Sequence, residues 1–171
     1  PVVSAKCRIV LIGCGHPDLM KLDRYAQTPT DAAFTMVVQI YTTNQTMDPD
    51  GAWEMINGDV SNAFLQGEAK QRELPIYMAP PRDPILAAAG VLVDAELYEV
   101  TGNIYGLPEA PQIFSGVVTE KMVVLEYRIH SLDVMCFMLY DKGKLIAVVI
   151  FHVDDMLGAI SPKYDWRPLF E

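Results

Sequence analysis

Basic residues are scarce in this sequence. Its 171 residues include 13 Lys and Arg against 22 Asp and Glu, which gives a formal net charge of −9 at pH 7. Proteins that hold nucleic acid usually neutralise several phosphates with Lys and Arg. We therefore expect any contact with nucleic acid to depend on a local group of basic residues, on a further region of the protein or on a partner.

Cysteine is also rare, and no apolar run is long. The three cysteines, Cys7, Cys14 and Cys136, are too few for a disulfide scaffold and have no trustworthy zinc spacing. The longest apolar run, 145–151, is far shorter than the roughly 18 to 20 residues of a membrane span. No signal peptide pattern opens the sequence. We expect an intracellular protein of a reducing compartment, the cytoplasm or nucleus, without a membrane span.

Several motifs that mark common enzyme classes are missing from the sequence. It has no glycine-rich phosphate loop, no dinucleotide fingerprint and no serine-nucleophile elbow. It also has no internal repeat and no low-complexity segment. A chain of this length is typical of one domain, so we expect a single domain over residues 1–171.

The hydrophobic pattern mixes helical and strand-like segments. Apolar spacing predicts helices over 28–44, with Thr28 as the cap and Pro29 at the first helical position, and over 110–126. A short helix is expected in 85–89. Strand-like patterns occupy 5–12, 53–60, 74–79, 96–100, 134–140, 145–153 and 156–160. The mixture predicts an α+β fold in which helices pack on an antiparallel sheet.

Three carboxylates stand at predicted strand ends. Asp59 ends one strand, and the pair Asp154 and Asp155 follows the apolar segment 145–153. A single Asp in such a place is usually a turn residue. Two adjacent carboxylates beside a core repel each other and lose solvation unless a cation compensates. One plus two carboxylates is the ligand set of a two-metal phosphoryl-transfer site, for which Mg²⁺ is the usual ion, so the pattern suggests a polymerase palm.

The other candidate residues can each be explained by an ordinary structural role as well as by a functional one. Phe64 is either a core aromatic or a residue that presses on a sugar, and Lys6 and Arg8 form either a solvated strand face or a contact to a triphosphate. Tyr105 and Gly106 precede the helix over 110–126, whose first amides would suit a phosphate, but a generic helix start explains them fully. His152 adjoins the acidic pair, and we expect it to pack rather than to catalyse.

Six blocks in order resemble the reverse transcriptase domain of copia-type LTR retrotransposons, from Lys6 to about Leu157. The two metal motifs are the most similar: Asp59-Val60-Ser61-Asn62-Ala63-Phe64-Leu65-Gln66-Gly67 and His152-Val153-Asp154-Asp155-Met156-Leu157. The others are Lys6-Cys7-Arg8-Ile9-Val10 with Gly13, Tyr25-Ala26 with Thr28-Pro29, Ile76-Tyr77-Met78 with Pro80-Pro81, and Leu97-Tyr98 with Ile104-Tyr105-Gly106-Leu107 and Ala110-Pro111.

The resemblance implies RNA-directed DNA synthesis with two Mg²⁺ ions, or Mn²⁺ in their place, on a template–primer with dNTPs. It implies a palm-like antiparallel sheet with packed helices and a partial fingers region. Asp59, Asp154 and Asp155 would be the catalytic metal ligands, and the Val60 carbonyl an accessory one. Phe64 would be the sugar gate. The remaining substrate contacts would come from Arg8, less certainly Lys6, and from the template-side motif with Tyr105 and Gly106.

The sequence also departs from the family's pattern. His152 stands where the family more often has Tyr. At three places where the family commonly has a basic residue, this sequence has Ile12, Pro108-Glu109 and Gln112. The family's thumb and RNase H regions are absent, so we expect the sequence to be a fragment. A second hypothesis therefore stays open: a reverse-transcriptase-derived protein of weak or no activity, reused as a structural or interaction subunit with protein partners in a larger assembly.

Overall fold

The computed structural model describes residues 8–15, 19–22, 25–48, 50–67, 75–80, 84–88, 90 and 97–170. The chain divides into two compact units that alternate along the sequence. The first unit comprises Pro1–Arg24 and Phe64–Ala110, and the second comprises Tyr25–Ala63 and Pro111–Glu171. The expectation of one domain over 1–171 stays a prediction.

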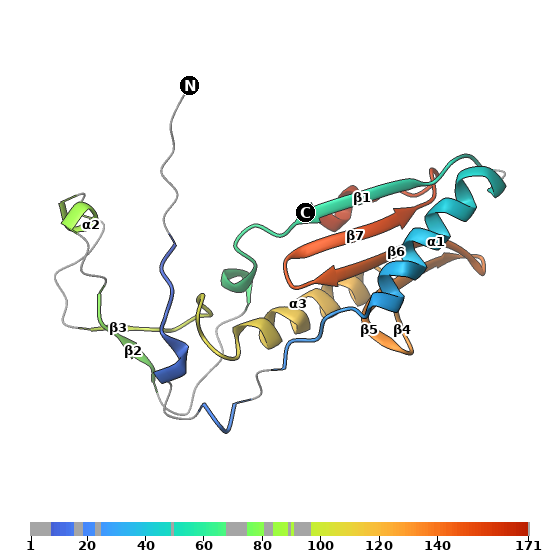
Figure 1. The fold of residues 1–171 in the computed structure, drawn as a ribbon. Helices are drawn as coiled ribbons and strands as arrows, with labels where there is room; N and C mark the ends of the chain where they lie inside the picture. The colour runs from blue at the N-terminus through green and yellow to red at the C-terminus, as the bar shows by residue number, and fades with distance from the viewer. Residues whose placement is uncertain are drawn as a thin grey trace. The chain divides into compact units, whose positions relative to one another are not determined.

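The second unit is built on a five-stranded antiparallel sheet in the order β1-β7-β6-β5-β4 (Figure 1). The strands are β1 (Glu54–Asp59), β4 (Arg128–His130), β5 (Asp133–Asp141), β6 (Lys144–His152) and β7 (Asp155–Ile160). Residues 147–151 of the central strand β6 are all buried, so both faces of the sheet are covered. The expected α+β class with an antiparallel sheet is thereby confirmed. The sequence pattern missed β4, which is only three residues long.

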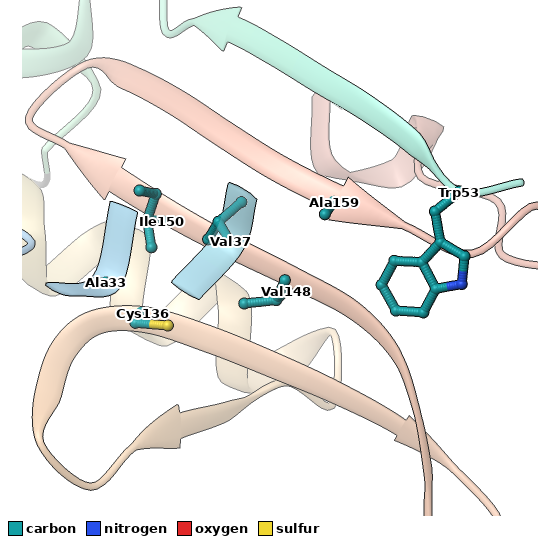
Figure 2. Packing of buried hydrophobic residues seen from close by; sticks show 7 residues of the cluster. All are labelled: Ala33, Val37, Trp53, Cys136, Val148, Ile150 and Ala159. Carbon is teal, nitrogen blue, oxygen red and sulfur yellow. The ribbon is translucent and has the colours of Figure 1, made fainter. Parts of the chain in front are cut away.

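Helix α1 (Asp31–Met47) covers one face of the sheet (Figure 2). Ala33 and Val37, one turn apart, are buried against Val148 and Ile150 of β6, in a cluster that also contains Trp53, Cys136 and Ala159. Burial of each such aliphatic side chain contributes roughly 1.5–3 kcal/mol. Burial also raises the pKa of the Cys136 thiol to about 12, with the Asp133 charge adding to it, so this cysteine stays protonated.

The start of α1 differs from the sequence prediction. Thr30, not Thr28, is the capping residue, and its hydroxyl accepts a hydrogen bond from the Ala33 amide at 3.2 Å. The reason is a contact 103 residues away in sequence. The Asp133 carboxylate accepts from the Thr30 amide at 2.7 Å and from the Thr30 hydroxyl at 2.9 Å. Pro29 therefore precedes the cap instead of opening the helix.

Helix α3 (Ala110–Val124) lies on the other side of the sheet, behind the strands in Figure 2. Phe114, Val118 and Met122 recur every four residues and are buried. On the strands, Phe137 and Phe151 are buried at positions that alternate with the α1 side, and their rings meet edge to face at 6.0 Å. The two helices thus enclose the sheet between two apolar layers.

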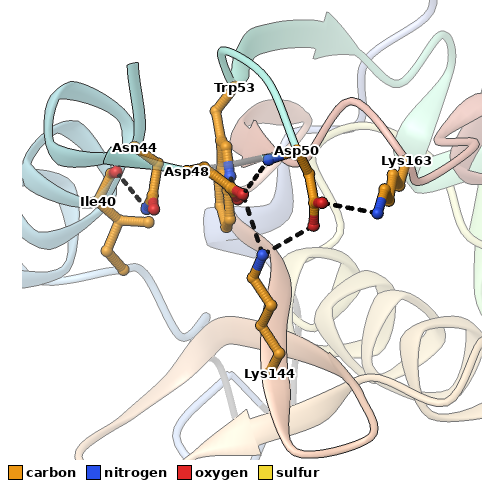
Figure 3. A network of polar contacts seen from close by, with 7 residues as sticks. All are labelled: Ile40, Asn44, Asp48, Asp50, Trp53, Lys144 and Lys163. Atoms are coloured by element: carbon orange, nitrogen blue, oxygen red, sulfur yellow. Dashed lines mark hydrogen bonds and ion pairs between the residues drawn. The ribbon is translucent and has the colours of Figure 1, made fainter. Parts of the chain in front are cut away.

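A polar cluster of Asp48, Asp50, Trp53, Lys144 and Lys163 lies at one end of this sheet (Figure 3). The Lys144 ammonium, at the start of β6, lies 3.0 Å from both the Asp48 and the Asp50 carboxylates, and Lys163 lies 2.7 Å from Asp50. The Trp53 indole donates to Asp48 at 2.6 Å. This hydrogen bond, followed by those from the Asp50 amide and Lys144, lowers the pKa of Asp48 to about 2. The cluster anchors the residue before β1 to the start of β6.

The first unit contains little regular structure. It has the short helix α2 (Pro84–Ala88), the 3-10 turn η1 (Gly13–Gly15) and a two-stranded sheet of β2 (Tyr77–Met78) and β3 (Tyr98–Glu99). Its core is Val100, Leu107 and Ala110, against which five partly buried residues pack: Leu11, Phe64, Ile76, Met78 and Ile104. The turn η2 (Ala63–Gln66) spans the boundary between the units, and η3 (Arg167–Phe170) lies near the end of the second unit.

Predicted strands of the first unit are shortened or absent. The expected strand 5–12 is wrong where the structure describes it, because residues 8–12 join no sheet. Within 8–12, the Leu11 amide donates to the Tyr105 carbonyl at 2.7 Å, and the Ile12 carbonyl accepts from the Gly15 amide at 3.1 Å in the local turn η1. The expected strands 74–79 and 96–100 reduce to β2 and β3. Among the described residues, no helix combines the length and the apolar character needed to cross a bilayer.

Candidate catalytic site

Asp59 and the second acidic block lie at the same end of the sheet. Asp59 is the last residue of β1 and is directly opposite Asp155, the first residue of β7. The Val60 amide then donates to the Asp154 carbonyl at 2.8 Å. Directly opposed residues of an antiparallel pair have side chains on one face, with Cβ atoms about 4.5–5.5 Å apart. The Asp59 and Asp155 carboxylates therefore share a face.

The turn between β6 and β7 places Asp154 next to a residue with a strained backbone. Val153 and Asp154 are its two central residues, and Val153 has φ = +58°. Of the two, only Val153 has positive φ, which is the pattern of a type II′ hairpin turn, where Gly is favoured at this position. A β-branched residue in this region costs about 1–3 kcal/mol. The pairing of β6 with β7 on one side and of β7 with β1 on the other maintains this conformation.

The acidic residues at this end are open to solvent. Asp59 and Asp155 are exposed and Asp154 is half-buried. None of the three forms an ion pair with a basic side chain in the described part of the chain. Carboxylate oxygens are the ligands that Mg²⁺ prefers, and the pair Asp59 and Asp155 is presented on one face. Asp59 and Asp155 therefore offer oxygen donors of the kind that a divalent cation takes.

The side chains do not form a ready-made metal centre. Across the described ranges, no three or more His, Cys, Asp or Glu side chains are grouped closely enough to hold a metal ion. The convergence of Asp59, Asp154 and Asp155 on two ions thus stays a prediction. The fold fixes the register of the strands, and this register sets the backbone positions of the three residues.

His152 is placed beside this group. It is the last residue of β6, lies directly opposite Asp155 and is exposed. The expectation of a packing role is wrong, because the buried segment of β6 ends one residue earlier, at Phe151. Its imidazole therefore lies on the face that carries the Asp155 carboxylate.

The other predicted substrate contacts form a second group, within the first unit. The Arg8 guanidinium lies over the Tyr105 ring, 4.5 Å from its centroid. The Phe64 ring lies 5.2 Å from the Tyr105 ring at an interplanar angle of 56°. Arg8 is exposed, whereas Tyr105 and Phe64 are half-buried. The structure thus brings together three of the predicted substrate-binding residues, and Lys6 lies outside the described residues.

Two glycines permit the segments 11–13 and 104–106 to cross closely beside the stack formed by Arg8, Tyr105 and Phe64. Gly106 has φ = +91°, and a Cβ added there would overlap the Leu11 carbonyl oxygen. A Cβ at Gly13 would overlap the Gly106 carbonyl oxygen in turn. The absence of a side chain at these two positions lets the segments 11–13 and 104–106 come into contact. Gly106 therefore has a structural role beyond the one the motif predicts.

Sequence reasoning missed the residues that support the site through the fold. Asp133 is 7 % exposed and binds Thr30 and the Met135 amide, yet it reads as one more turn Asp. Trp53 and Lys144 tie β1 to β6 at the far end of the sheet. The only local signal was the hairpin turn before Lys144. The contacts of Asp133 with Thr30 and of Lys144 with Asp48 could not be predicted, because they join residues 103 and 96 positions apart in sequence.

Comparisons of this chain with protein-family models, with curated proteins and with solved structures gave no match.

Proposed function

We propose that this chain is the fingers–palm portion of an RNA-directed DNA polymerase of the type found in copia-like LTR retrotransposons. The sheet unit would be the palm and the first unit a partial fingers region. The observation that carries the proposal is the register of β1 with β7, in which Asp59 lies opposite Asp155 and Val60 is hydrogen-bonded to Asp154. Two acidic motifs 95 residues apart, recognised from sequence alone, meet at one sheet end.

Each residue of the acidic group has a defined task in this proposal. Asp59, Asp154 and Asp155 would hold two divalent cations, which when bound lower the pKa of the primer 3′-hydroxyl and hold the pyrophosphate leaving group. Asp59 and Asp155 are presented from paired strands, so their separation is set by the sheet. The strained turn at Val153 sets the position of Asp154. Val60, through its carbonyl, would add a neutral oxygen next to Asp59.

The stack in the first unit would handle the incoming nucleotide. Arg8 supplies a guanidinium, which pairs bidentately with phosphate oxygens. Phe64 supplies an apolar ring, which leaves no room for a ribose 2′-hydroxyl. Both side chains contact Tyr105. Their proximity supports a shared substrate, because a triphosphate and its sugar are joined in one molecule.

Primer extension on an RNA template, with Mg²⁺ or Mn²⁺, tests the proposal. The variants are Asp154→Asn and the matched control Asp141→Asn, which alters an exposed Asp at the other hairpin turn of β6. We expect extension by the original chain and by Asp141→Asn, and a loss of about 100-fold or more for Asp154→Asn. Equal extension by all three proteins would refute the assigned role of Asp154.

The excess of acidic over basic residues favours a second candidate function. In it, the chain is a reused polymerase fold that serves as a subunit of a larger assembly. Lys144 and Lys163 are already paired with Asp48 and Asp50, and Arg167 is paired with Asp165. These three cations are therefore poorly placed to bind phosphates. The second candidate predicts no extension by any variant together with recovery of the chain in a stoichiometric complex.

A further inference from the structure

Tyr105 occupies the centre of the stack in the first unit. The Arg8 guanidinium and the Phe64 ring both contact its ring, at centroid distances of 4.5 Å and 5.2 Å. The sequence predicted Tyr105 as a substrate contact within the template-side motif, without a separate role for its ring. The ring thus contacts both side chains that are proposed to meet the nucleotide.

The backbone fixes this ring relative to the segment that carries Arg8. The Tyr105 carbonyl accepts the Leu11 amide at 2.7 Å, three residues after Arg8. Gly13 and Gly106 allow the two segments to cross with no side chain between them. On the other side, Phe64 packs against the core that contains Leu107, two residues after Tyr105. Tyr105 is thus held between both partners by main-chain geometry.

We propose that Tyr105 is a positioning residue that couples triphosphate binding by Arg8 to sugar discrimination by Phe64. This inference rests on the proposed polymerase function and adds a residue role to it. The physical reason is side-chain freedom. An exposed Arg has many rotamers, and contact with an aromatic face restricts them before a ligand arrives, which lowers the entropy cost of binding. The same ring limits the tilt of Phe64.

A double-mutant cycle tests the coupling. Arg8→Ala, Tyr105→Leu and the double variant are compared, with Tyr105→Phe as the conservative replacement that keeps the ring. Tyr77→Leu is the matched control, because Tyr77 is an exposed tyrosine of the same unit. Each protein is titrated with dGTP, dGMP and GTP, and KM and kcat are measured in primer extension.

We expect Arg8→Ala to weaken dGTP binding about tenfold in the original background, since it removes a charge-assisted contact, and about twofold in the Tyr105→Leu background. Tyr105→Leu should raise KM for dGTP, leave kcat nearly unchanged and reduce the preference for dGTP over GTP. Binding of dGMP should change little in the Arg8 variants. Tyr105→Phe and Tyr77→Leu should behave like the original chain.

Two kinds of failure are distinguishable. Additive effects of Arg8→Ala and Tyr105→Leu, in a chain that binds dGTP, would overturn the inference and leave the polymerase proposal standing. Equal losses of dGTP and dGMP binding in Tyr105→Leu, with a lowered melting temperature, would reduce Tyr105 to a packing residue and overturn it as well. A chain that neither binds dGTP nor extends a primer would remove both proposals together.

Discussion

Val60 and Asp154 are joined by a backbone hydrogen bond of 2.8 Å, which continues the pairing of β1 with β7 beyond the last residue of β1. This bond ties the residue after the first acidic motif to the turn that carries the second. The sheet end is therefore fixed by main-chain contacts, and the exposed carboxylates on it contribute little to its stability. A site built this way can tolerate carboxylate substitutions without unfolding.

The turn itself is open to test through Val153. Replacing Val153 by Gly should raise the free energy of unfolding by about 0.5–1 kcal/mol, because relief of the positive-φ strain exceeds the added freedom of Gly in the unfolded chain. Chemical denaturation measures the change. Val134→Gly in β5 is the control and should be destabilising, since that residue is in an extended strand. A loss of stability at both positions would show that Val153 is not strained.

Asp133 should matter far more to stability than its turn-like sequence suggests. Its carboxylate accepts from the Thr30 amide, the Thr30 hydroxyl and the Met135 amide. Asp133→Ala leaves the buried Met135 amide and the two partly buried Thr30 donors without their acceptor, so we expect a loss of about 2–4 kcal/mol in unfolding free energy. Asp141→Ala, at the exposed end of the same strand, should cost less than about 0.5 kcal/mol. Similar costs at both ends would contradict the capping role.

Asp48 should make stability depend on acid pH. Its pKa is lowered to about 2 in the folded chain, first by the Trp53 indole, from an ordinary value of 3.8. The folded state therefore binds this proton less readily than the unfolded state, and the stabilisation is complete above about pH 4 and is lost as pH falls toward 2. The stability difference between the original chain and Asp48→Asn, measured by denaturation from pH 2 to 7, should shrink over that window. Trp53→Phe, which lacks the indole donor, should weaken the effect, and a pH-independent difference would refute it.

The sequence was sufficient to predict the elements that carry strong local patterns. The apolar run that became β6, the hairpin before it and the helix α3 were all found, because buried central strands and helices show their periodicity directly. The sequence also predicted that Asp59 and the pair Asp154 and Asp155 stand at the ends of neighbouring strands, and β1 does pair with β7 there, whereas their convergence on a metal site stays a prediction.

Elements held by distant contacts were predicted less well. The cap of α1 was misplaced by two residues because Asp133 stabilises Thr30 from 103 residues away. The segment 8–12 has a strand-like composition, yet it joins no sheet, and its hydrogen bond to a distant part of the sequence runs from the Leu11 amide to the Tyr105 carbonyl. The contact of Arg8, Tyr105 and Phe64 also joins three separate segments. No local pattern reports such contacts, because each depends on how the chain folds back on itself.

Binding of a primer–template at two or more salt concentrations distinguishes the polymerase from the reused subunit. With a net charge of −9 and several cations already paired, few phosphates can be neutralised, so we expect micromolar or weaker affinity at physiological salt. The slope of log K against log salt is about −0.9 for each neutralised phosphate on a DNA duplex. Arg8→Ala should therefore make the slope shallower by about 1 if Arg8 contacts a phosphate of the bound nucleic acid, and leave it unchanged if Arg8 serves the incoming nucleotide alone.

Weak, salt-sensitive binding supports the polymerase, whereas no binding at low salt supports the subunit. Tight binding that ignores salt would contradict both, because neither an acidic palm nor a protein-binding subunit supplies a salt-independent grip on a polyanion.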